Sequence, residues 1–560
     1  MISVSGKSWI ENKKNIKKIQ KLSIDNNLTT NLSKFYLNRG FSIDEIMFKK
    51  KNIPEMNNFF KNNKDFLDAK NLLIKTIQNK DLTLVFGDYD VDGIASVSIL
   101  LNYFKEINHP CYYIIPNRFK DGYGPNIELL RNKIRKNTKT VIFVDCGTNS
   151  NDVLDFLIKK KINILIIDHH QILNKISQNI IMINPQKNPS KYFNDNICAA
   201  ALTFFLLSLF QSKLININKY IIFALLGTIC DIMPMRSINR YLALKASNNF
   251  NEISNPGLKQ IINLLNLKKK ISYEDLSYII GPILNSSGRI KTANISVDLL
   301  TSDNKKEIFE LSKKLFHLNT LRKKIEKENM ELLNKEKSNC TNQVIFIFNK
   351  NLHEGVIGII AGKLKEKFNI PTFILTSSSK NLIKGSVRST NNFNLKKLFC
   401  KLLQLNVIEN GGGHETAGGF VVKENKLSLL QKLINKEYKK IKKINIFFYD
   451  IKLSLPKKNS IIFSEINELE PFGNKNPEPS ILFQSLKILK SKVINNRHIQ
   501  CILKNKTGST IKSISFDAVN TPVGNYLLNF KKEFDLVGSI NENIWNNKKT
   551  HQIIIKDLII

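Results

Sequence analysis

Several features are scarce in this sequence, and each scarcity excludes a class of protein. The chain has seven cysteines in 560 residues. They form no Cys-x-x-Cys pair and no regular spacing, which excludes a zinc ribbon and a disulfide framework and favours a reducing cytoplasm. The longest apolar run, residues 197–210, is too short to span a bilayer, so we expect a buried helix there and no membrane partner. The first twenty residues lack the apolar core of a signal peptide.

Acidic residues are also scarce relative to basic ones. The chain has 85 Lys and Arg against 47 Asp and Glu, a formal net charge of +38. This excess indicates a polyanionic partner, most simply nucleic acid. The sequence is rich in Lys, Asn and Ile throughout, so part of the excess reflects a general compositional bias. The charge therefore indicates the kind of partner without locating a site.

Short apolar segments alternate with helical patterns from residue 82 onward. The predicted strands are residues 82–86, 111–115, 141–144 and 162–167. This alternation is typical of a parallel, doubly wound sheet, and therefore of an α/β fold. Ligands of such sheets bind at the carboxyl ends of the strands.

The rest of the chain divides by pattern. A second α/β pattern covers residues 344–422, and period-two strands with turn signals at Asn495-Asn496 and Thr507-Gly508 follow after residue 445. The tail predicts a small OB-like β-barrel. The charged stretch between the two α/β patterns predicts a solvated helical linker. The predicted divisions are 1–70 (polar, helical), 71–300 (parallel-sheet domain), 301–340 (helical linker), 341–440 (smaller α/β domain) and 441–560 (barrel).

Three carboxylates follow the first predicted strand at alternate positions. Asp88, Asp90 and Asp92 repel one another unless a cation binds them, and a divalent metal is the natural candidate. Taken alone the segment has a second interpretation, because strand-to-helix loops also use Asp as an N-cap or turn former. The later segments decide between the two.

Further acidic clusters follow other predicted elements. Asp145 ends the strand at 141–144, Asp168-His169-His170 ends the strand at 162–167, and Asp231 follows an apolar helix. A single His on an apolar strand is most often a packed core residue, but two adjacent histidines after an Asp at a strand end favour ligands. Carboxylates with one or two imidazoles suit Mn²⁺ or Mg²⁺ better than structural zinc. The sequence therefore predicts one metal site built from these clusters.

This series of clusters resembles the DHH phosphoesterase superfamily, and further motifs are similar to the RecJ single-strand-specific exonucleases. These motifs are residues 115–124, 284–289, 353–358, 385–389, 411–419 and 469–479. Departures are small. Leu352 stands where Trp is common, and Ser286-Ser287 stand where Ala-Ala is usual. The resemblance implies a DHH parallel-sheet domain and a smaller DHHA1-type α/β domain joined by a helical linker, with a C-terminal OB-like barrel.

The resemblance also implies roles for individual residues. Asp90, Asp92, Asp145, His169 and Asp231 are the expected ligands of two Mn²⁺ or Mg²⁺ ions, with Asp145 between them and Asp88 as a further candidate. Asp168 is expected to orient the histidines, and His170 to contact the scissile phosphate. The expected substrate-binding residues are Arg118, Tyr123, Asn285, Arg289, His353, Ser386, Arg388, Gly412, Gly413 and His414.

The implied activity is a metal-dependent exonuclease that degrades single-stranded DNA from the 5′ end and releases mononucleotides, in DNA repair and recombination. Single-stranded DNA is then the partner, with a helicase or a single-strand-binding protein as further candidates. One alternative is a DHH phosphodiesterase acting on oligoribonucleotides or dinucleotides. Another is a non-catalytic scaffold that binds single-stranded DNA. The loss of an acidic ligand would mark a scaffold, and no motif acid is missing.

Overall fold

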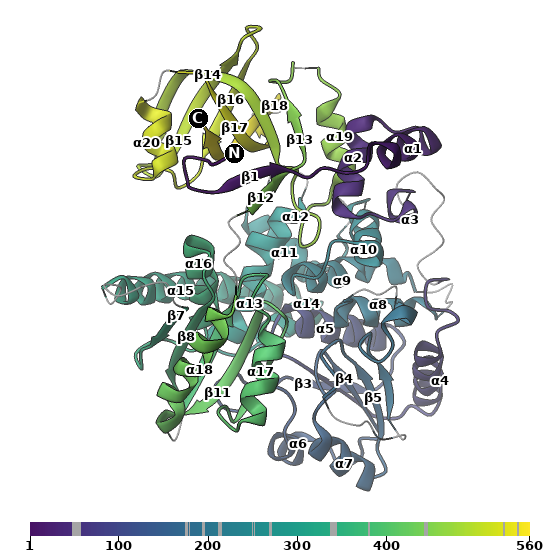
Figure 1. Ribbon diagram of the computed structural model, residues 1–560. Coiled ribbons are helices and arrows are strands. Elements are labelled where there is room, and N and C mark those ends of the chain that lie inside the picture. Colours follow the sequence, from purple (N-terminus) through teal and green to yellow (C-terminus); the bar gives the residue numbers. More distant parts are fainter. Residues whose placement is uncertain are drawn as a thin grey trace. The chain divides into compact units, whose positions relative to one another are not determined.

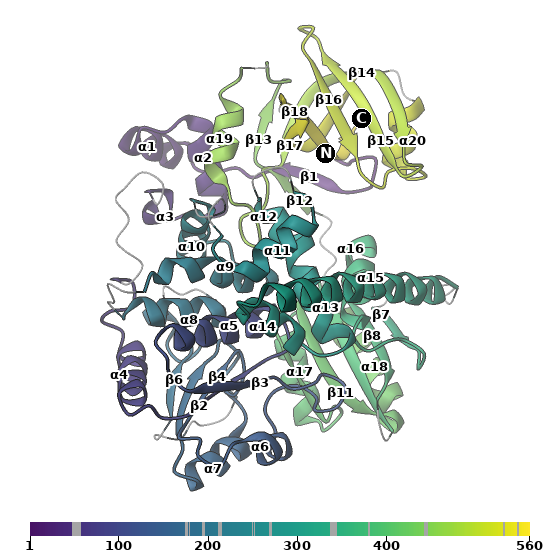
Figure 2. The ribbon, with the colours of Figure 1, turned by 180° about the vertical axis from the view of Figure 1, so that it is seen from behind.

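The computed structural model (Figures 1 and 2) forms two compact units. One unit comprises Met1–Ile53, Pro234–Tyr241 and Lys443–Ile560, and the other comprises Pro54–Met233 and Leu242–Lys442. The residues described are 1–47, 58–173, 177, 180–192, 196–210, 215–248, 250, 253–267, 271–335, 344–378, 381–441, 446–457, 459–529, 532–545 and 548–560. The predicted boundary at 340/341 and Cys340 lie outside these residues.

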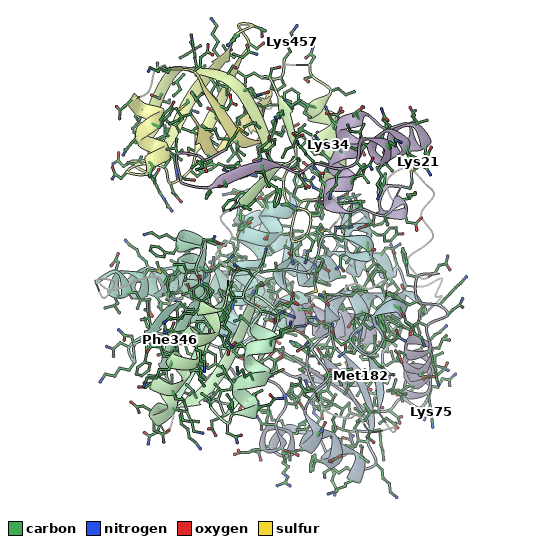
Figure 3. The ribbon with its side chains drawn as sticks, viewed as in Figure 1. Lys21, Lys34, Lys75, Met182, Phe346 and Lys457 are labelled. Carbon is green, nitrogen blue, oxygen red and sulfur yellow. The ribbon has the colours of Figure 1, made fainter. Side chains whose placement is uncertain are left out.

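The larger unit is built on a five-stranded parallel sheet, which confirms the predicted fold class. Its strands are β2 (Thr83–Gly87), β3 (Cys111–Ile114), β4 (Thr140–Val144), β5 (Asn163–Ile167) and β6 (Ile181–Ile183). Their order is β3-β2-β4-β5-β6. Strands β2 and β4 are buried along their whole length, as expected of a parallel sheet with both faces covered. Met182 of β6 belongs to the hydrophobic core on one face of this sheet (Figure 3). By contrast, three lysines in other parts of the chain are exposed: Lys21, Lys75 and Lys457.

Helices cover both faces of this sheet. Side chains of α6 (Ile127–Lys133) and α7 (Asn151–Lys159) join the core that contains Leu84, Phe86 and Phe143. Helices α4 (Lys64–Gln78), α5 (Val91–Glu106) and α8 (Ala199–Ser208) contact the strands as well. Helix α8 is buried along nearly its whole length, so the long apolar run is a core helix as predicted. No helix among the described residues is long and apolar enough to cross a membrane.

A helical layer follows the sheet and leads to the second α/β region. It contains α9 (Ile221–Cys230), α10 (Ser237–Asn248), α11 (Pro256–Leu264), α12 (Tyr273–Asp275), α13 (Gly281–Ile290) and α14 (Asn294–Thr301). Helix α15 (Lys305–Lys335) runs along α13 and α14 (Figure 2). Its charged sequence predicts a solvated helix, yet Asn319, Arg322, Glu326 and Asn329 are buried in the structure. These polar side chains pair with one another or with neighbouring segments, which makes their burial tolerable.

The second α/β region has a mixed five-stranded sheet in the order β10-β11-β9-β8-β7. Its strands are β7 (Ile345–Phe348), β8 (Thr372–Ser377), β9 (Leu382–Arg388), β10 (Asn410–Gly413) and β11 (Ala417–Lys423). Its helices are α16 (Ile357–Phe368), α17 (Leu395–Gln404) and α18 (Leu427–Lys439).

The smaller unit contains a closed five-stranded barrel, as the tail pattern predicts. Strands β14 (Ile481–Ile494), β15 (His498–Asn505), β16 (Thr510–Ser515), β18 (Lys548–Ile559) and β17 (Phe534–Trp545) pair in turn, and β17 pairs back with β14. The turns fall at the predicted Asn495-Asn496, both with positive φ, and at Thr507-Gly508. Strand β13 (Ile451–Leu453), α19 (Ile462–Leu469) and α20 (Pro522–Asn529) complete this part.

The first residues of the chain belong to the barrel's unit, which the sequence does not indicate. Strand β1 (Ser8–Glu11) pairs in parallel with β12 (Ile446–Tyr449). Helices α1 (Ile16–Asn26), α2 (Thr30–Arg39) and α3 (Ile43–Met47) follow it, and side chains of α2 share a core with α19.

Candidate metal centre

The acidic clusters meet because three neighbouring strands end together. Gly87 of β2 is paired with Val144 of β4, which is paired in turn with Ile167 of β5. The residues that follow these strands therefore reach the same edge of the sheet. Asp90 also caps α5, accepting hydrogen bonds from the amides of Asp92 and Gly93. The N-cap interpretation of the first acidic segment therefore applies to Asp90, and the metal-ligand interpretation stays a prediction.

Three groups of possible ligand atoms lie together at this edge. In each group the atoms are within 4.8 Å of one another: Asp88, Asp90 and Asp145; Asp145, Asp168, His169 and His170; and His169, Asp231 and His414. Asp145 belongs to two of these groups. It adopts a left-handed backbone, with φ of 59°, and is 2% exposed. The expectation that Asp145 lies between two ions is compatible with this arrangement.

His169 faces a ring of carboxylates. Its Nε2 lies 3.2 Å from Asp145 Oδ1, 3.3 Å from Asp231 Oδ2 and 3.7 Å from Asp92 Oδ2. Burial lowers the pKa of His169 to about 4, so the imidazole is neutral near pH 7, which is the form that binds a metal. Burial raises the pKa of Asp231, but its interactions with His169 and His414 outweigh burial and hold that pKa below its usual value.

Asp92 has a second function in the fold. Its two carboxylate oxygens accept hydrogen bonds from the amides of Ala199 (2.8 Å) and Ala200 (2.9 Å), at the first turn of α8. The N-cap residue of α8, Cys198, makes no side-chain cap, so Asp92 satisfies these amides from another part of the chain. Each carboxylate oxygen keeps another lone pair. These bonds therefore orient Asp92 without excluding it as a ligand.

Asp168 holds the two histidines in place. Its Oδ1 accepts from the amide of His169 (2.7 Å) and lies 2.7 Å from His170 Nδ1. Its Oδ2 accepts from the Thr148 hydroxyl at 2.6 Å. Burial raises the pKa of Asp168, but the charge and hydrogen bond of His170 outweigh it and hold that pKa well below the usual value. For His170, burial is outweighed by Asp168, which raises the pKa to about 10.

The carboxylates need a cation to stay ionised together. Burial and then the charge of Asp90 raise the pKa of Asp88 to about 8, and burial and then Asp231 raise that of Asp92 to about 7. Burial and then Asp92 also raise the pKa of Asp145. Asp88 Oδ1 is buried without a hydrogen-bond partner among the described residues. Buried carboxylate oxygens beside a neutral imidazole form a donor set that fits Mn²⁺ or Mg²⁺.

A hairpin from the second α/β region reaches this centre. His414 follows β10, and its amide donates to the carbonyl of Ala417 at the start of β11. Its Nε2 lies 3.8 Å from Asp231 Oδ1, and its ring stacks near that of His170 at 6.2 Å between centroids. Gly412, two residues before it, is exposed, while Gly413 packs on the backbone of Ala417. The candidate metal centre thus draws side chains from both α/β regions of the larger unit.

Three arginines gather beside the carboxylates. Arg118 follows β3, Arg289 lies on α13 and Arg388 ends β9. Burial, then Arg118 and Arg388, lower the pKa of Arg289 to about 9. Arg289 Nη1 donates to the carbonyl of Gly355 (3.3 Å), and Arg388 Nη1 to that of Val387 (3.0 Å). No ion pair of these three with a carboxylate is found among the described residues. We name Arg118, Arg289 and Arg388 the arginine cluster.

The other expected substrate residues lie around this cluster. Ser386 is two positions before Arg388 on β9, and the hydroxyl and guanidinium both approach Gly358. Asn285 is one helical turn before Arg289 on α13. The Tyr123 hydroxyl lies 3.1 Å from His170 Nε2. His353 lies edge-on to Phe119 and therefore contacts the loop that carries Arg118.

Several supporting residues escape analysis of the sequence. Thr148 bonds Asp168, the Tyr89 ring lies under Arg118, and Asn329 of α15 accepts from the amide of His353 at 2.9 Å. Thr148 and Asn329 have no charge or spacing that marks them. Only Tyr89 carries a local signal, because it lies between Asp88 and Asp90.

Three family models match this chain. They are the DHH family N-terminal domain over residues 83–228, the DHHA1 domain over 341–440 and the RecJ OB domain over 449–557. The chain therefore has the two domains of the DHH superfamily followed by an OB domain of the RecJ type. Over these three regions the chain resembles the RecJ family.

Curated relatives carry the same description, "Single-stranded-DNA-specific exonuclease RecJ". The relative from Bacillus subtilis is 26% identical over 509 residues, which cover 89% of this chain and 64% of that protein. The relative from Haemophilus influenzae is 26% identical over 81% of this chain and 84% of that one, and that from Escherichia coli is 24% identical over 88% and 89%.

Solved structures support the fold. RecJ from Thermus thermophilus in complex with Mn²⁺ matches with a TM-score of 0.81 at 20% identity, covering 98% of this chain and 79% of that one. An exonuclease RecJ bound to manganese matches with a TM-score of 0.57 at 24% identity, covering 67% and 94%.

Proposed function

We propose that this chain is a Mn²⁺- or Mg²⁺-dependent exonuclease that removes mononucleotides from the 5′ end of single-stranded DNA. One observation carries the proposal: a buried carboxylate and imidazole centre lies beside three arginines that have no carboxylate partner among the described residues. The carboxylates and imidazoles could hold the metal ions, and the arginines could bind a terminal phosphate. The names of the relatives supply the substrate class, single-stranded DNA.

The proposed metal ligands are Asp90, Asp92, Asp145, His169 and Asp231, with Asp88 as a sixth. Two divalent ions held there would activate water and stabilise the charge on the attacked phosphate. The remaining steps belong to the protein. Asp168 fixes the ring of His170 so that Nε2 is directed toward the position that the Tyr123 hydroxyl occupies. In this orientation, His170 Nε2 can form a hydrogen bond with a non-bridging oxygen of the scissile phosphate.

The proposed polarity follows from the arginine cluster. A 5′-terminal phosphate carries nearly two negative charges, one more than an internal phosphate, so grouped guanidiniums favour an end over a continuous strand. The exposed rings of Phe119 and Tyr123 lie on the same loop as Arg118 and can stack the terminal base. With the 5′-phosphate held at this loop, the metal centre would cleave the phosphodiester bond one nucleotide from the 5′ end.

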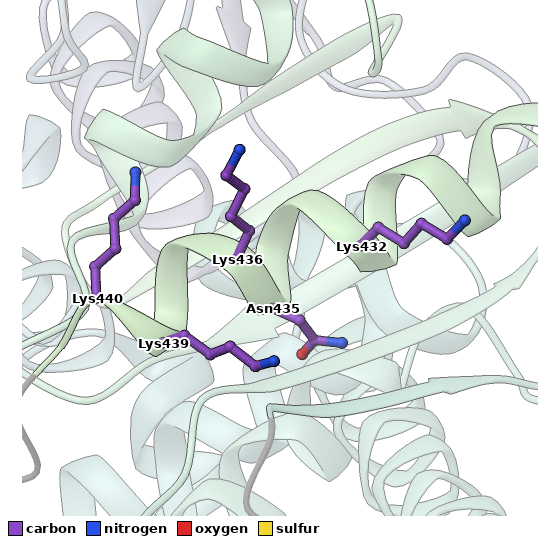
Figure 4. A pocket seen from close by; sticks show the side chains of 5 residues that line it. All are labelled: Lys432, Asn435, Lys436, Lys439 and Lys440. Atoms are coloured by element: carbon purple, nitrogen blue, oxygen red, sulfur yellow. The ribbon is translucent and has the colours of Figure 1, made fainter.

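The alternative functions fit the structure less well. A dinucleotide needs no strand-binding barrel, whereas this chain has a closed one with lysines along β14 and β15. A scaffold has no need of buried carboxylates with raised pKa values. A further basic surface lies on α18, where Lys432, Lys436, Lys439, Lys440 and Asn435 line an open hollow (Figure 4). It suits a polyanion, and binding should weaken steeply with salt.

Single-stranded DNA is the proposed partner, and a cytoplasmic location is proposed with it. The six cysteines among the described residues are free, as a reducing compartment requires. We propose a helicase or a single-strand-binding protein as a further partner, because either class works on the single-stranded DNA that is the proposed substrate.

The decisive experiment is digestion of end-labelled single-stranded DNA with Mn²⁺ or Mg²⁺, each end being blocked in turn. Blocking the 5′ end should stop release of mononucleotides, and blocking the 3′ end should not. Asp145→Asn should lower the rate by about 100-fold or more. The matched control is Asp152→Asn, an exposed carboxylate in the first turn of α7.

Metal binding is measured separately from activity. A saturating ion, at about 100 times its Kd, should stabilise the wild type by about 2.7 kcal/mol, and this gain should disappear in Asp145→Asn. Digestion from the 3′ end would overturn the polarity, and full activity of Asp145→Asn would overturn the metal assignment.

A further inference from the structure

We infer that Tyr89 is a positioning residue that selects strands with a 5′-phosphate, because its ring fixes the guanidinium of Arg118 in the arginine cluster. This inference rests on the proposed function, and in particular on capture of the 5′-phosphate by these arginines. It assigns a role to the aromatic residue of the acidic segment 88–92.

The contact between the two side chains is close. Arg118 Cζ lies 4.2 Å from the centroid of the Tyr89 ring, the distance of a guanidinium stacked over an aromatic face. Arg118 Nε is buried and has no hydrogen-bond partner among the described residues. Stacking on an aromatic face orients a guanidinium while leaving its N–H donors unused. The ring thus holds Arg118 in a state ready to bind an anion.

Tyr89 is itself held from two sides. Its carbonyl packs against Gly288 so closely that a Cβ on Gly288 would overlap it. Gly288 directly precedes Arg289, so the Tyr89 backbone also adjoins the second arginine of the cluster. On the other side, the Tyr123 ring meets the Tyr89 ring edge-on, with 6.2 Å between centroids and an interplanar angle of 76°. The ring therefore has little freedom to turn away from Arg118.

The charges around Arg118 explain why such support is needed. After burial, the charge of Arg118 is the next cause that lowers the pKa of both Arg289 and Arg388, as expected of cations that repel one another. Without a bound anion, a flexible arginine would turn toward solvent. An aromatic face opposes this because it attracts the cation without neutralising it. A carboxylate in the same place would compete with the phosphate for the guanidinium.

The test compares 5′-phosphorylated and 5′-hydroxyl strands of one sequence. The measured quantity is the ratio of kcat/KM for the two strands. Tyr89→Leu removes the aromatic face and should reduce this ratio about tenfold, mainly through a higher KM on the phosphorylated strand. Tyr89→Phe keeps the face and should retain the wild-type ratio. Arg118→Ala should reduce the ratio at least as much, and adding Tyr89→Leu to it should cause little further loss.

A matched control is available elsewhere in the larger unit. Arg135 stacks on Tyr112 in the same way, with 4.3 Å from Cζ to the ring centroid. Tyr112→Leu should leave the ratio unchanged. The Mn²⁺-induced thermal shift of Tyr89→Leu should match that of the wild type, since Tyr89 is not proposed as a ligand.

The outcomes are distinguishable. If the wild type shows no preference for the 5′-phosphate, the proposed phosphate capture fails and the inference fails with it. If the wild type has the preference and Tyr89→Leu keeps it, only the inference is wrong. If Tyr89→Leu does not fold, a Tyr89→Phe variant that loses the preference would overturn the role of the ring face. An equal loss on both strands would assign Tyr89 to the metal centre instead.

Discussion

Asp557 is expected to hold the first residues of the chain on the barrel. This fully buried carboxylate of β18 accepts hydrogen bonds from Ser3 Oγ (2.7 Å), Trp9 Nε1 (3.0 Å) and Ser5, through both its amide and its hydroxyl. Asp557→Ala would leave the buried donors of Ser3 and Trp9 without this acceptor, whereas the exposed Ser5 can bond water instead. Each hydrogen bond to a charged group contributes about 1.5–3 kcal/mol, and relaxation and water entry recover part of the loss. We expect the smaller unit to lose about 3–5 kcal/mol of stability.

The assay uses tryptophan fluorescence. The chain has two tryptophans, so in a Trp545→Phe background Trp9 is the only one. Trp9 is 5% exposed, and its release into water should shift the emission to longer wavelength. Asp557→Ala should move the Trp9 transition to a clearly lower urea concentration, and Asp557→Asn, which keeps one acceptor oxygen, should move it less. The transition midpoint is the quantity to compare, since a chain of two units need not unfold in one step. An unchanged midpoint in Asp557→Ala would refute the reasoning.

Two further predictions concern packing and pH. Gly227→Ala would place a Cβ against Asp92 Oδ1 and the side chain of Ala200, so it should cost about 1–3 kcal/mol and also weaken Mn²⁺ binding, as thermal shifts with and without the ion would show. A stability loss with unchanged Mn²⁺ affinity would contradict the link to Asp92. Glu45 is buried, which raises its pKa, but its hydrogen bonds with Arg236 and with the amides of Ser42 and Ser237 together outweigh burial and hold that pKa below its usual value. The pKa of Glu45 is thus lower in the folded protein than in the unfolded chain. Its ionised form therefore stabilises the fold at pH values above the unfolded pKa, and this stabilisation is lost as the pH falls through the folded pKa. Urea unfolding of the wild type between pH 6 and pH 3 should show this loss of stability. In Glu45→Gln the stability should depend less steeply on pH, and an equal pH dependence in both proteins would contradict the role of Glu45.

The sequence predicts those parts of the site that local pattern determines. Asp145 and Asp168 each follow an apolar run that can only be a buried strand, and in-register parallel strands must end at one edge. The turns of the barrel are predictable for a similar reason, because Asn495 and Asn496 tolerate the positive φ that a tight hairpin requires. In both cases the deciding interaction lies within a few residues of the pattern.

Contacts between distant segments are not predictable in this way. Asp92 caps α8 across 107 residues, and its sequence pattern equally suits an ordinary ligand or a local cap. The barrel's unit takes in the first residues of the chain through Asp557, which is 554 positions from Ser3. A buried carboxylate near the end of a Lys-rich chain looks like any other surface acid until its partners are known.

Helix α15 shows why composition alone misleads here. Its lysines and glutamates predict a solvated surface, and most of them are exposed, yet Asn329 is buried and accepts from the amide of His353. His353 Nδ1 in turn accepts from the amide of Gly355, whose carbonyl accepts from Arg289. A residue of the linking helix is thus connected by hydrogen bonds to the arginine cluster. Charged residues such as Arg289 can be recognised by type, but their orientation depends on uncharged partners such as Asn329 and Tyr89. The chemistry of this site is therefore readable from the sequence, whereas its geometry depends on residues that no charge pattern distinguishes.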